Sequence, residues 1–227
     1  PTKPETVKEF TFTKSDFERV RALIYQRAGI SLADSKQEMV YSRLARRLRA
    51  TGIGSFVQYL DDLEAGRLGE EWQSFTNALT TNLTSFFRES HHFPLLAEHV
   101  KKARDKPITI WCSASSTGEE PYSIAMTVCE AFNTLNPPVQ IIATDIDTNV
   151  LSVGANGVYA LDRIGKLEPA RLKKFFLRGK GAQEGMVRVR PELRNLVTFR
   201  QLNLLADGWQ LNNQFDVIFC RNVMIYF

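Results

Sequence analysis

The segment with the clearest chemical signature is a polar turn at residues 115–121, which separates a strand-like run at 108–114 from a helical pattern. A second apolar strand, at 139–144, ends on Asp145. A tight turn in this position lets the backbone approach a ligand, and an acid after the next strand can accept hydrogen bonds from a ribose diol. The pattern therefore predicts a nucleoside-binding site on an α/β sheet.

The residues of the turn argue against a dinucleotide. Gly118 is followed by Glu119 and Glu120, and the turn lacks the G-x-G-x-x-G pattern that seats a pyrophosphate on a helix N-terminus. Two carboxylates would repel a diphosphate, whereas they suit the cationic amino-acid tail of S-adenosylmethionine. The residues alone support a structural alternative equally well, in which Thr117-x-x-Glu120 is a capping box and Pro121 opens a helix.

Polar residues also mark the ends of the later strands. Asn203 comes at the end of a third predicted strand, and Arg221 and Asn222 follow a fourth. The carboxyl ends of parallel strands line one crevice in a doubly wound sheet, so we expect these side chains around a single cavity with Asp145. A helix N-cap is the alternative role for Asp145, but Asp147 could fill it, and we favour ribose binding for Asp145.

Apolar residues recur at helical spacing through the first 80 residues, with Gly29 and Gly52 as stop signals. Four helices are expected, at about residues 15–28, 35–51, 55–65 and 71–83. The patterns Ser15-x-x-Glu18 and Ser35-x-x-Glu38 predict capping boxes at the start of the first two. On the second helix Lys36, Arg43 and Arg47 share one face, which is either solvated or suited to an acidic helical partner.

From residue 108 onward strands alternate with helices, which is typical of a parallel sheet with helical crossovers. Strands are expected at 108–114, 139–144, 196–204 and 215–220. Glycines at 179, 181 and 185 and an alternating run at 186–190 predict a small inserted β-subdomain, and such insertions often carry partner binding. Further strands are expected beyond residue 227, because an open sheet would otherwise end on an exposed central strand.

Composition narrows the class of protein. No apolar run in the 227 residues approaches the ~20 needed to span a bilayer, so we expect no membrane insertion. The three cysteines form no C-x-x-C pair, which favours a reducing cytoplasm. His91, His92 and His99 lack metal-ligand spacing, and no metal is expected. The net charge of +4 suits an acidic partner, either nucleic acid or an acidic protein surface.

Taken in order, seven segments of the chain resemble the chemotaxis receptor methyltransferases of bacteria, the CheR family. They are TTNLTSFFRE at 80–89, HHFP at 91–94, STGEEPYSIAM at 116–126, DID at 145–147, EGMVRVR at 184–190, NLL at 203–205 and FCRNVMIYF at 219–227. Because these segments span nearly the whole chain in the same order, the match is highly specific.

The resemblance implies S-adenosylmethionine as the methyl donor, S-adenosylhomocysteine as the product, and no metal. It implies glutamate side chains in the cytoplasmic helical domain of methyl-accepting chemoreceptors as acceptors. It also implies an N-terminal helical domain at 1–85 and a Rossmann-like class I methyltransferase domain at 86–227, with an antiparallel β-subdomain inserted at about 165–195. In some members that insert grips an aromatic pentapeptide at the receptor C-terminus, and residues 178–185 look like the gripping kind.

The resemblance also implies which residues form the site. By the family pattern, the cofactor should be contacted by Asn82, Thr84, Arg88, Glu119 or Glu120, Asp145, Asn203, Leu204, Arg221 and Asn222. Of the two glutamates Glu120 is favoured for the cofactor's amino group. Arg88 and Tyr226 should lie near the transferring methyl, as the catalytic residues.

Two other functions fit parts of the sequence. The basic charge fits a nucleic-acid methyltransferase, but Asn136-Pro-Pro-Val139 precedes the second strand and lacks the aromatic of the corresponding signature. Base-stacking motifs are missing as well, so no nucleic-acid partner is expected. A helical adaptor that merely retains a cofactor fold is the non-enzymatic alternative, and it would not bind S-adenosylhomocysteine.

Overall fold

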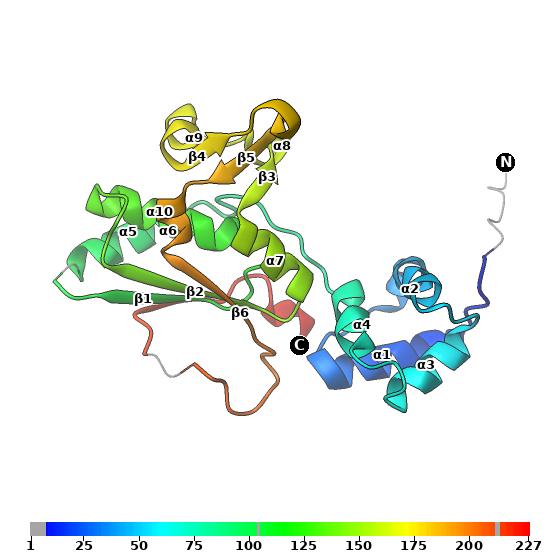
Figure 1. The fold of residues 1–227 in the computed structure, drawn as a ribbon. Coiled ribbons are helices and arrows are strands. Elements are labelled where there is room, and N and C mark those ends of the chain that lie inside the picture. Colours follow the sequence, from blue (N-terminus) through cyan, green and yellow to red (C-terminus); the bar gives the residue numbers. More distant parts are fainter. Residues whose placement is uncertain (1–7, 104, 212–213) are drawn as a thin grey trace. The chain divides into compact units, whose positions relative to one another are not determined.

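The computed structural model describes residues 8–103, 105–211 and 214–227. The chain forms two compact units (Figure 1). One comprises the residues up to Thr80 together with Ile225–Phe227, and the other comprises Thr81–Met224.

The first unit is built from four helices, as predicted. They are α1 (Lys14–Ala28), α2 (Gln37–Thr51), α3 (Phe56–Glu64) and α4 (Glu71–Leu79), with a short 3-10 turn, η1 (Asp34–Lys36), before α2. Gly29 and Gly52 end α1 and α2 with left-handed φ angles of 69° and 72°, so both predicted stops are confirmed. Helix α4 ends earlier than predicted, because Thr80 is extended.

Both predicted capping boxes in this unit are wrong. The box on α1 lies two residues earlier, where the Thr13 hydroxyl accepts the Asp16 N–H and the Asp16 carboxylate accepts the Thr13 N–H. Helix α2 follows η1 directly, and its N-cap, Lys36, makes no side-chain hydrogen bond. A sequence pattern fixes the approximate start of a helix, but neighbouring serines and threonines compete for the cap.

Two of the basic residues on α2 stabilise this unit from within. Arg47 forms a bidentate pair with the buried carboxylate of Glu71, at 2.8 Å for each oxygen. Arg43 donates to the carbonyl oxygens of Ala78 and Thr80, at 3.2 and 2.6 Å. Arg47 therefore joins the first residue of α4 to α2, and Arg43 joins the C-terminal end of α4 to the same helix.

The second unit contains a parallel sheet and a small antiparallel sheet, which confirms the predicted fold class. The parallel sheet is formed by β1 (Ile108–Cys112), β2 (Val139–Asp145), β6 (Val197–Gln201) and β7 (Val217–Phe219), in the order β6-β2-β1-β7. Figure 1 shows helices α5 (His92–Lys102), α6 (Glu119–Phe132) and α7 (Thr148–Asn156) gathered on one side of it. The order of strands along the sheet reverses between β1 and β7, and a ligand crevice is expected outside the carboxyl ends there.

The small sheet, in the order β3-β5-β4, is the predicted insert. Its strands are β3 (Val158–Ala160), β4 (Phe176–Arg178) and β5 (Met186–Val189), all antiparallel. Between them lie α8 (Leu161–Ile164), α9 (Pro169–Phe175) and η2 (Gly181–Gln183), and α10 (Pro191–Arg194) leads back to β6. The last element is η3 (Met224–Tyr226).

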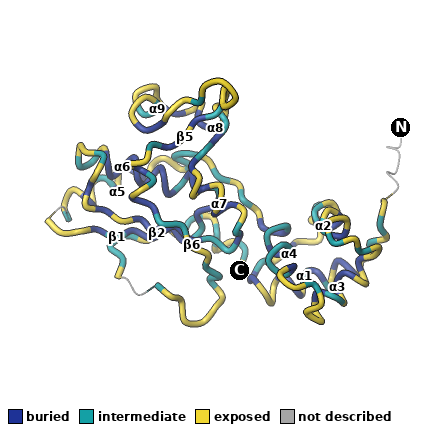
Figure 2. The backbone as a smooth tube through the Cα atoms, in the orientation of Figure 1, coloured by how far each residue is buried: buried dark blue, intermediate teal, exposed yellow. Residues whose placement is uncertain are grey.

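The core of this unit lies between the parallel sheet and helix α6. Ile110, Ile141 and every residue of α6 from Pro121 to Cys129 are buried, and dark blue predominates along these elements in Figure 2. Strands covered on both faces are rich in apolar residues, and this is why 108–114 and 139–144 were recognisable in the sequence.

The polar turn before α6 is closely packed. Gly118 has a left-handed φ of 97°, and a Cβ there would lie 2.8 Å from both Gly154 Cα and the Tyr159 hydroxyl oxygen. Gly118 is the N-cap of α6 and Thr117 makes no cap, so the capping-box alternative is wrong. The Thr117 hydroxyl donates instead to the carboxylate of Glu119, at 2.6 Å. Glycine is therefore required here by backbone conformation and by space.

Candidate active site

The carboxylate of Asp145 is held rigidly at the end of β2. Its Oδ2 accepts the Ser116 N–H at 2.8 Å and its Oδ1 accepts the Asp147 N–H at 3.0 Å. Burial raises the pKa of Asp145, although backbone N–H groups, those of Asp147 and Ser116 foremost, oppose that shift. An ionised carboxylate offers about four lone-pair sites, so a group fixed in this way can also accept hydrogen bonds from the hydroxyls of a ribose.

Asp147, rather than Asp145, caps helix α7. Its Oδ1 accepts the N–H groups of Asn149 and Val150, at 2.9 and 3.3 Å. Its Oδ2 accepts the amide of Asn82 at 2.9 Å, which brings the segment before α5 to the end of β2. The alternative role weighed for Asp145 is thus filled by its neighbour.

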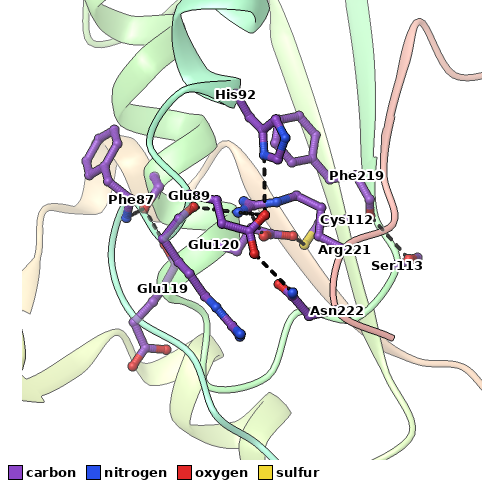
Figure 3. A network of polar contacts seen from close by, with 12 residues as sticks. Phe87, Glu89, His92, Cys112, Ser113, Glu119, Glu120, Phe219, Arg221 and Asn222 are labelled. Atoms are coloured by element: carbon purple, nitrogen blue, oxygen red, sulfur yellow. Dashed lines mark hydrogen bonds and ion pairs between the residues drawn. The ribbon is translucent and has the colours of Figure 1, made fainter. Parts of the chain in front are cut away.

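Glu120, in the first turn of α6, lies between the ends of β1 and β7. Arg221 Nη1 donates to its Oε2 at 2.7 Å, and the Cys112 thiol donates to its Oε1 at 3.3 Å (Figure 3). The side chains of Glu120 and Arg221 are only 13% and 10% exposed. Burial raises the pKa of Glu120, and the charge of Arg221 partly offsets that increase. A buried carboxylate at the switch point of the sheet is suited to a cationic ligand group.

A loop before α5 completes this network. Arg221 also donates to the Arg88 carbonyl oxygen and lies 3.3 Å from the Glu89 carboxylate. Asn222 donates its amide to Glu89 at 3.1 Å. Hydrogen bonds from Asn222 and Arg221 hold the pKa of Glu89 below its usual value. The Phe87 N–H donates to Ser123 Oγ at 2.9 Å, and this hydrogen bond attaches the loop to helix α6.

Backbone strain concentrates around this network. Five non-glycine residues in the described part of the chain have positive φ, namely Phe87, Glu89, Ser116, Asn133 and Asn222. All except Asn133 belong to the loops just described. A left-handed conformation costs a non-glycine residue about 1–3 kcal/mol and persists where the surroundings enforce it, often at functional sites. The strain therefore points to the same loops as the polar contacts do.

Glu119 faces a different environment from Glu120. Its side chain is fully buried, and its carboxylate contacts the Thr117 hydroxyl and forms an ion pair with Arg163 of α8. In Figure 3 it points away from the group around Arg221. The structure thus brings Glu120, and not Glu119, to the crevice.

The remaining predicted residues lie around this centre in different ways. Arg88 is half-buried and donates to the Leu83 carbonyl oxygen at 2.8 Å. Its charge helps to lower the pKa of Glu89 and opposes the increase in the pKa of Glu120. Thr84, on the same segment, is half-buried.

The loop after β6 carries two more predicted residues, Asn203 and Leu204. Both are half-buried, and the loop is tied to β2 because the Leu202 N–H donates to the Asp145 carbonyl oxygen at 2.9 Å. Tyr226 belongs to the helical unit, where its carbonyl oxygen accepts the Ser31 N–H at 3.0 Å.

Four residues that take part in the polar contacts of the site were not expected from the sequence: Glu89, Cys112, Ser116 and Arg163. Glu89 adjoins Arg88, and Ser116 lies within the turn, so their positions offered a weak signal. Cys112 reads as an ordinary buried thiol and Arg163 as a surface cation, and only the fold brings them to Glu120 and Glu119.

The described residues contain no group of three or more His, Cys, Asp or Glu side chains arranged to hold a metal ion. No helix among them combines the length and the apolar character needed to cross a bilayer. The polar side chains gathered at the site instead carry carboxylates, guanidinium groups and amides. Those groups fit a nucleoside that carries a zwitterionic amino acid, with Asp145 for the sugar and Glu120 for an ammonium group.

Comparisons with known proteins agree with that chemistry. The family model described as "CheR methyltransferase, all-alpha domain" matches residues 15–80, and "CheR methyltransferase, SAM binding domain" matches residues 82–227. The chain is 54% identical over 222 residues to "Chemotaxis protein methyltransferase 2" of Pseudomonas aeruginosa, covering 97% of this chain and 79% of the relative. It is 51% identical over 223 residues to "Chemotaxis protein methyltransferase" of Salmonella typhimurium, covering 98% and 77%.

Proposed function

The chain belongs to the CheR methyltransferase family, whose members methylate protein glutamate side chains in chemotaxis, and we propose how its own residues perform that reaction. One observation carries the proposal. The Asp145 carboxylate lies at the end of β2, and the Glu120 carboxylate lies at the start of the helix that follows the neighbouring strand, β1; each is fixed by hydrogen bonds. S-Adenosylmethionine, when bound, supplies the methyl group on a positively charged sulfonium.

In this proposal Asp145 accepts hydrogen bonds from both ribose hydroxyls. Glu120 accepts the ammonium of the amino-acid tail, and Arg221, already beside it, takes the tail's carboxylate. A guanidinium presents several donors in a plane, which is the geometry a carboxylate requires. Asn82, Thr84, Asn203, Leu204 and Asn222 line the remaining sides. We assign Glu119 a structural role, in which it stabilises the turn at residues 115–121.

The acceptor needs little activation. A glutamate side chain has an ordinary pKa of about 4.3, so the attacking carboxylate is already ionised at neutral pH and no general base is required. The protein therefore contributes by positioning the carboxylate in line with the methyl and by excluding water from it. We assign the positioning of the attacking carboxylate to Arg88.

We further propose that the inserted sheet binds an extended peptide at the receptor C-terminus. Among the strands of the described residues β4 pairs with β5 alone, so its outer edge can pair with an added strand. Leu177 on β4 is 42% exposed and offers an apolar contact beside that edge.

The three cysteines are free, with Cys112 and Cys129 buried, which supports a reducing cytoplasmic location.

Two measurements test the proposal. Labelled methyl donor is incubated with receptor-containing membranes and, separately, with RNA. Base-labile label should appear in the receptors, whereas label in RNA alone would contradict the function. Calorimetry with S-adenosylhomocysteine and with a receptor C-terminal peptide, each titrated alone, then tests the two binding sites independently. A peptide that fails to bind removes the docking proposal and leaves the catalytic one intact.

A further inference from the structure

The cofactor turn and the inserted subdomain are joined through Glu119. This carboxylate is fully buried, and one of its two side-chain partners, Arg163, comes from α8 within the insert. Arg163 remains 48% exposed, so its guanidinium reaches inward from the surface to neutralise the buried acid. The ion pair with Glu119 is the largest cause of the raised pKa of Arg163. A charge buried without a partner is strongly unfavourable, so the position of Glu119 depends on Arg163.

A second contact joins the same two parts of the chain. The hydroxyl of Tyr159, on β3, donates to the Thr117 carbonyl oxygen at 2.7 Å. The Tyr159 side chain is buried, and its ring packs edge-on against Phe86, with 5.2 Å between ring centroids. Its hydroxyl oxygen also occupies the space that a Cβ on Gly118 would need. The insert therefore contacts the turn through one charged and one neutral hydrogen bond.

The turn carries two groups that face the crevice. The backbone N–H of Ser116 fixes Asp145, and Glu120 directly follows Glu119 at the start of α6. A shift in the peptide units from Thr117 to Glu119 would move both groups at once. Ser116 already has a left-handed φ of 47°, a conformation that needs support from its surroundings.

We propose that Arg163 and Tyr159 are positioning residues, through which the inserted subdomain fixes the turn that binds the cofactor. The inference rests on the proposed function, because it assigns these residues to the affinity of that site. It gives the insert a role in cofactor binding in addition to its proposed role in receptor docking.

The test is calorimetric titration of the full chain with S-adenosylhomocysteine. Arg163→Leu should raise the Kd about tenfold, and Arg163→Lys should recover part of the loss. The double variant Glu119→Gln/Arg163→Leu should bind more tightly than Arg163→Leu, since it removes the unpaired charge. Lys173→Leu, which removes an exposed cation from α9 of the same subdomain, is the matched control and should leave the Kd unchanged.

Tyr159→Phe provides an independent variant that retains the buried ring and loses only the hydrogen bond to Thr117. It should raise the Kd several-fold with the binding stoichiometry unchanged. A purely structural role predicts the opposite pattern, in which the fraction of competent protein falls while the Kd of the remainder stays at the wild-type value. That pattern, or wild-type Kd values in both Arg163→Leu and Tyr159→Phe, would overturn the inference. Wild-type protein that binds no S-adenosylhomocysteine would instead overturn the proposed function.

Discussion

The guanidinium of Arg221 lies 2.7 Å from the carboxylate of Glu120, although 101 positions separate the two residues in the chain. The pair connects the N-terminus of α6 to the loop after β7, at the point where the order of the sheet reverses. A zwitterionic amino acid placed beside such a pair meets an acceptor for its ammonium and a donor for its carboxylate. The affinity for such a ligand should therefore depend on Glu120 and on the fixed carboxylate of Asp145.

Replacing Glu120 with glutamine should weaken the binding of S-adenosylhomocysteine about tenfold or more. The substitution retains the shape of the side chain and removes a charged hydrogen bond, which is worth about 1.5–3 kcal/mol, where 1.4 kcal/mol corresponds to tenfold. Methylthioadenosine, which lacks the amino-acid tail, should bind both proteins equally. Glu192→Gln, at an exposed carboxylate of α10, is the control for calorimetry. Equal loss of both ligands would contradict the ammonium role.

Replacing Asp145 with alanine should weaken both ligands, because both carry the ribose. The loss of two hydrogen bonds to a carboxylate, at about 1.5 kcal/mol or more each, predicts a decrease of about a hundredfold or more in affinity. The contrast with Glu120→Gln separates the two roles within one set of titrations. A variant that binds methylthioadenosine as tightly as the wild-type protein would remove Asp145 from the sugar site.

Affinity for S-adenosylhomocysteine should fall on acidification, beginning at a higher pH than an ordinary carboxyl group would cause. Burial raises the pKa values of Glu120 and Asp145, and the ligand requires both groups as anions, so affinity is lost as the pH falls through the raised values. Folding responds with the opposite sign. A carboxyl group whose folded pKa is raised favours the folded state below its unfolded pKa and loses that contribution as the pH rises through the folded value.

The loss of affinity should therefore precede any acid unfolding. Titrations at successive pH values, with circular dichroism at each, check this order. Glu120→Gln should show a shallower decline than the wild-type protein, since one of the two titrating groups is gone. Constant wild-type affinity down to the pH of unfolding would contradict the assignment.

One cysteine of the three should react with a thiol reagent in the native protein. Cys220 is exposed, whereas burial raises the pKa of Cys112 well above its ordinary value and that of Cys129 to about 12. The thiolate is the reactive form, so the two buried thiols should remain inert at neutral pH. A colorimetric count should give one fast thiol in buffer and three in denaturant. A second fast thiol in buffer would show that the core opens readily.

Gly154→Ala should destabilise the α/β unit. A Cβ at this position would lie 2.5 Å from the ring of Phe199, closer than carbon atoms pack, and overpacking of this kind costs about 1–3 kcal/mol. Gly165→Ala is the matched control, because its nearest neighbours would be carbonyl oxygens at 3.7 and 3.8 Å. Urea unfolding of both variants measures the difference. Equal midpoints would show that Phe199 moves aside without cost.

Much of the fold could be predicted from local pattern. Strands β1 and β2 are rich in apolar residues because most of their side chains are buried, and the acid that ends β2 marks the carboxyl edge of the sheet. The stops at Gly29 and Gly52 were equally plain, since left-handed φ favours glycine. The insert was recognisable from its glycines and its alternating run.

Other features depend on contacts that no local pattern encodes. Glu119 and Glu120 are adjacent and chemically identical. Glu119 is buried in an ion pair with Arg163, which lies 44 positions away in the chain. Glu120 instead lies at the crevice, where it is bonded to Arg221. Helix starts were misplaced for a related reason, because Thr13 and Ser15 are comparable caps in sequence and packing decides between them. Positive φ at Phe87 and Ser116 is likewise imposed by the surroundings.

The most direct test of the account is a crystal structure of the chain bound to S-adenosylhomocysteine. The account predicts both ribose hydroxyls within hydrogen-bond distance of the two Asp145 carboxylate oxygens, with the ligand's amino group against Glu120. A nucleoside bound elsewhere on the molecule, or a sugar turned away from Asp145, would contradict it.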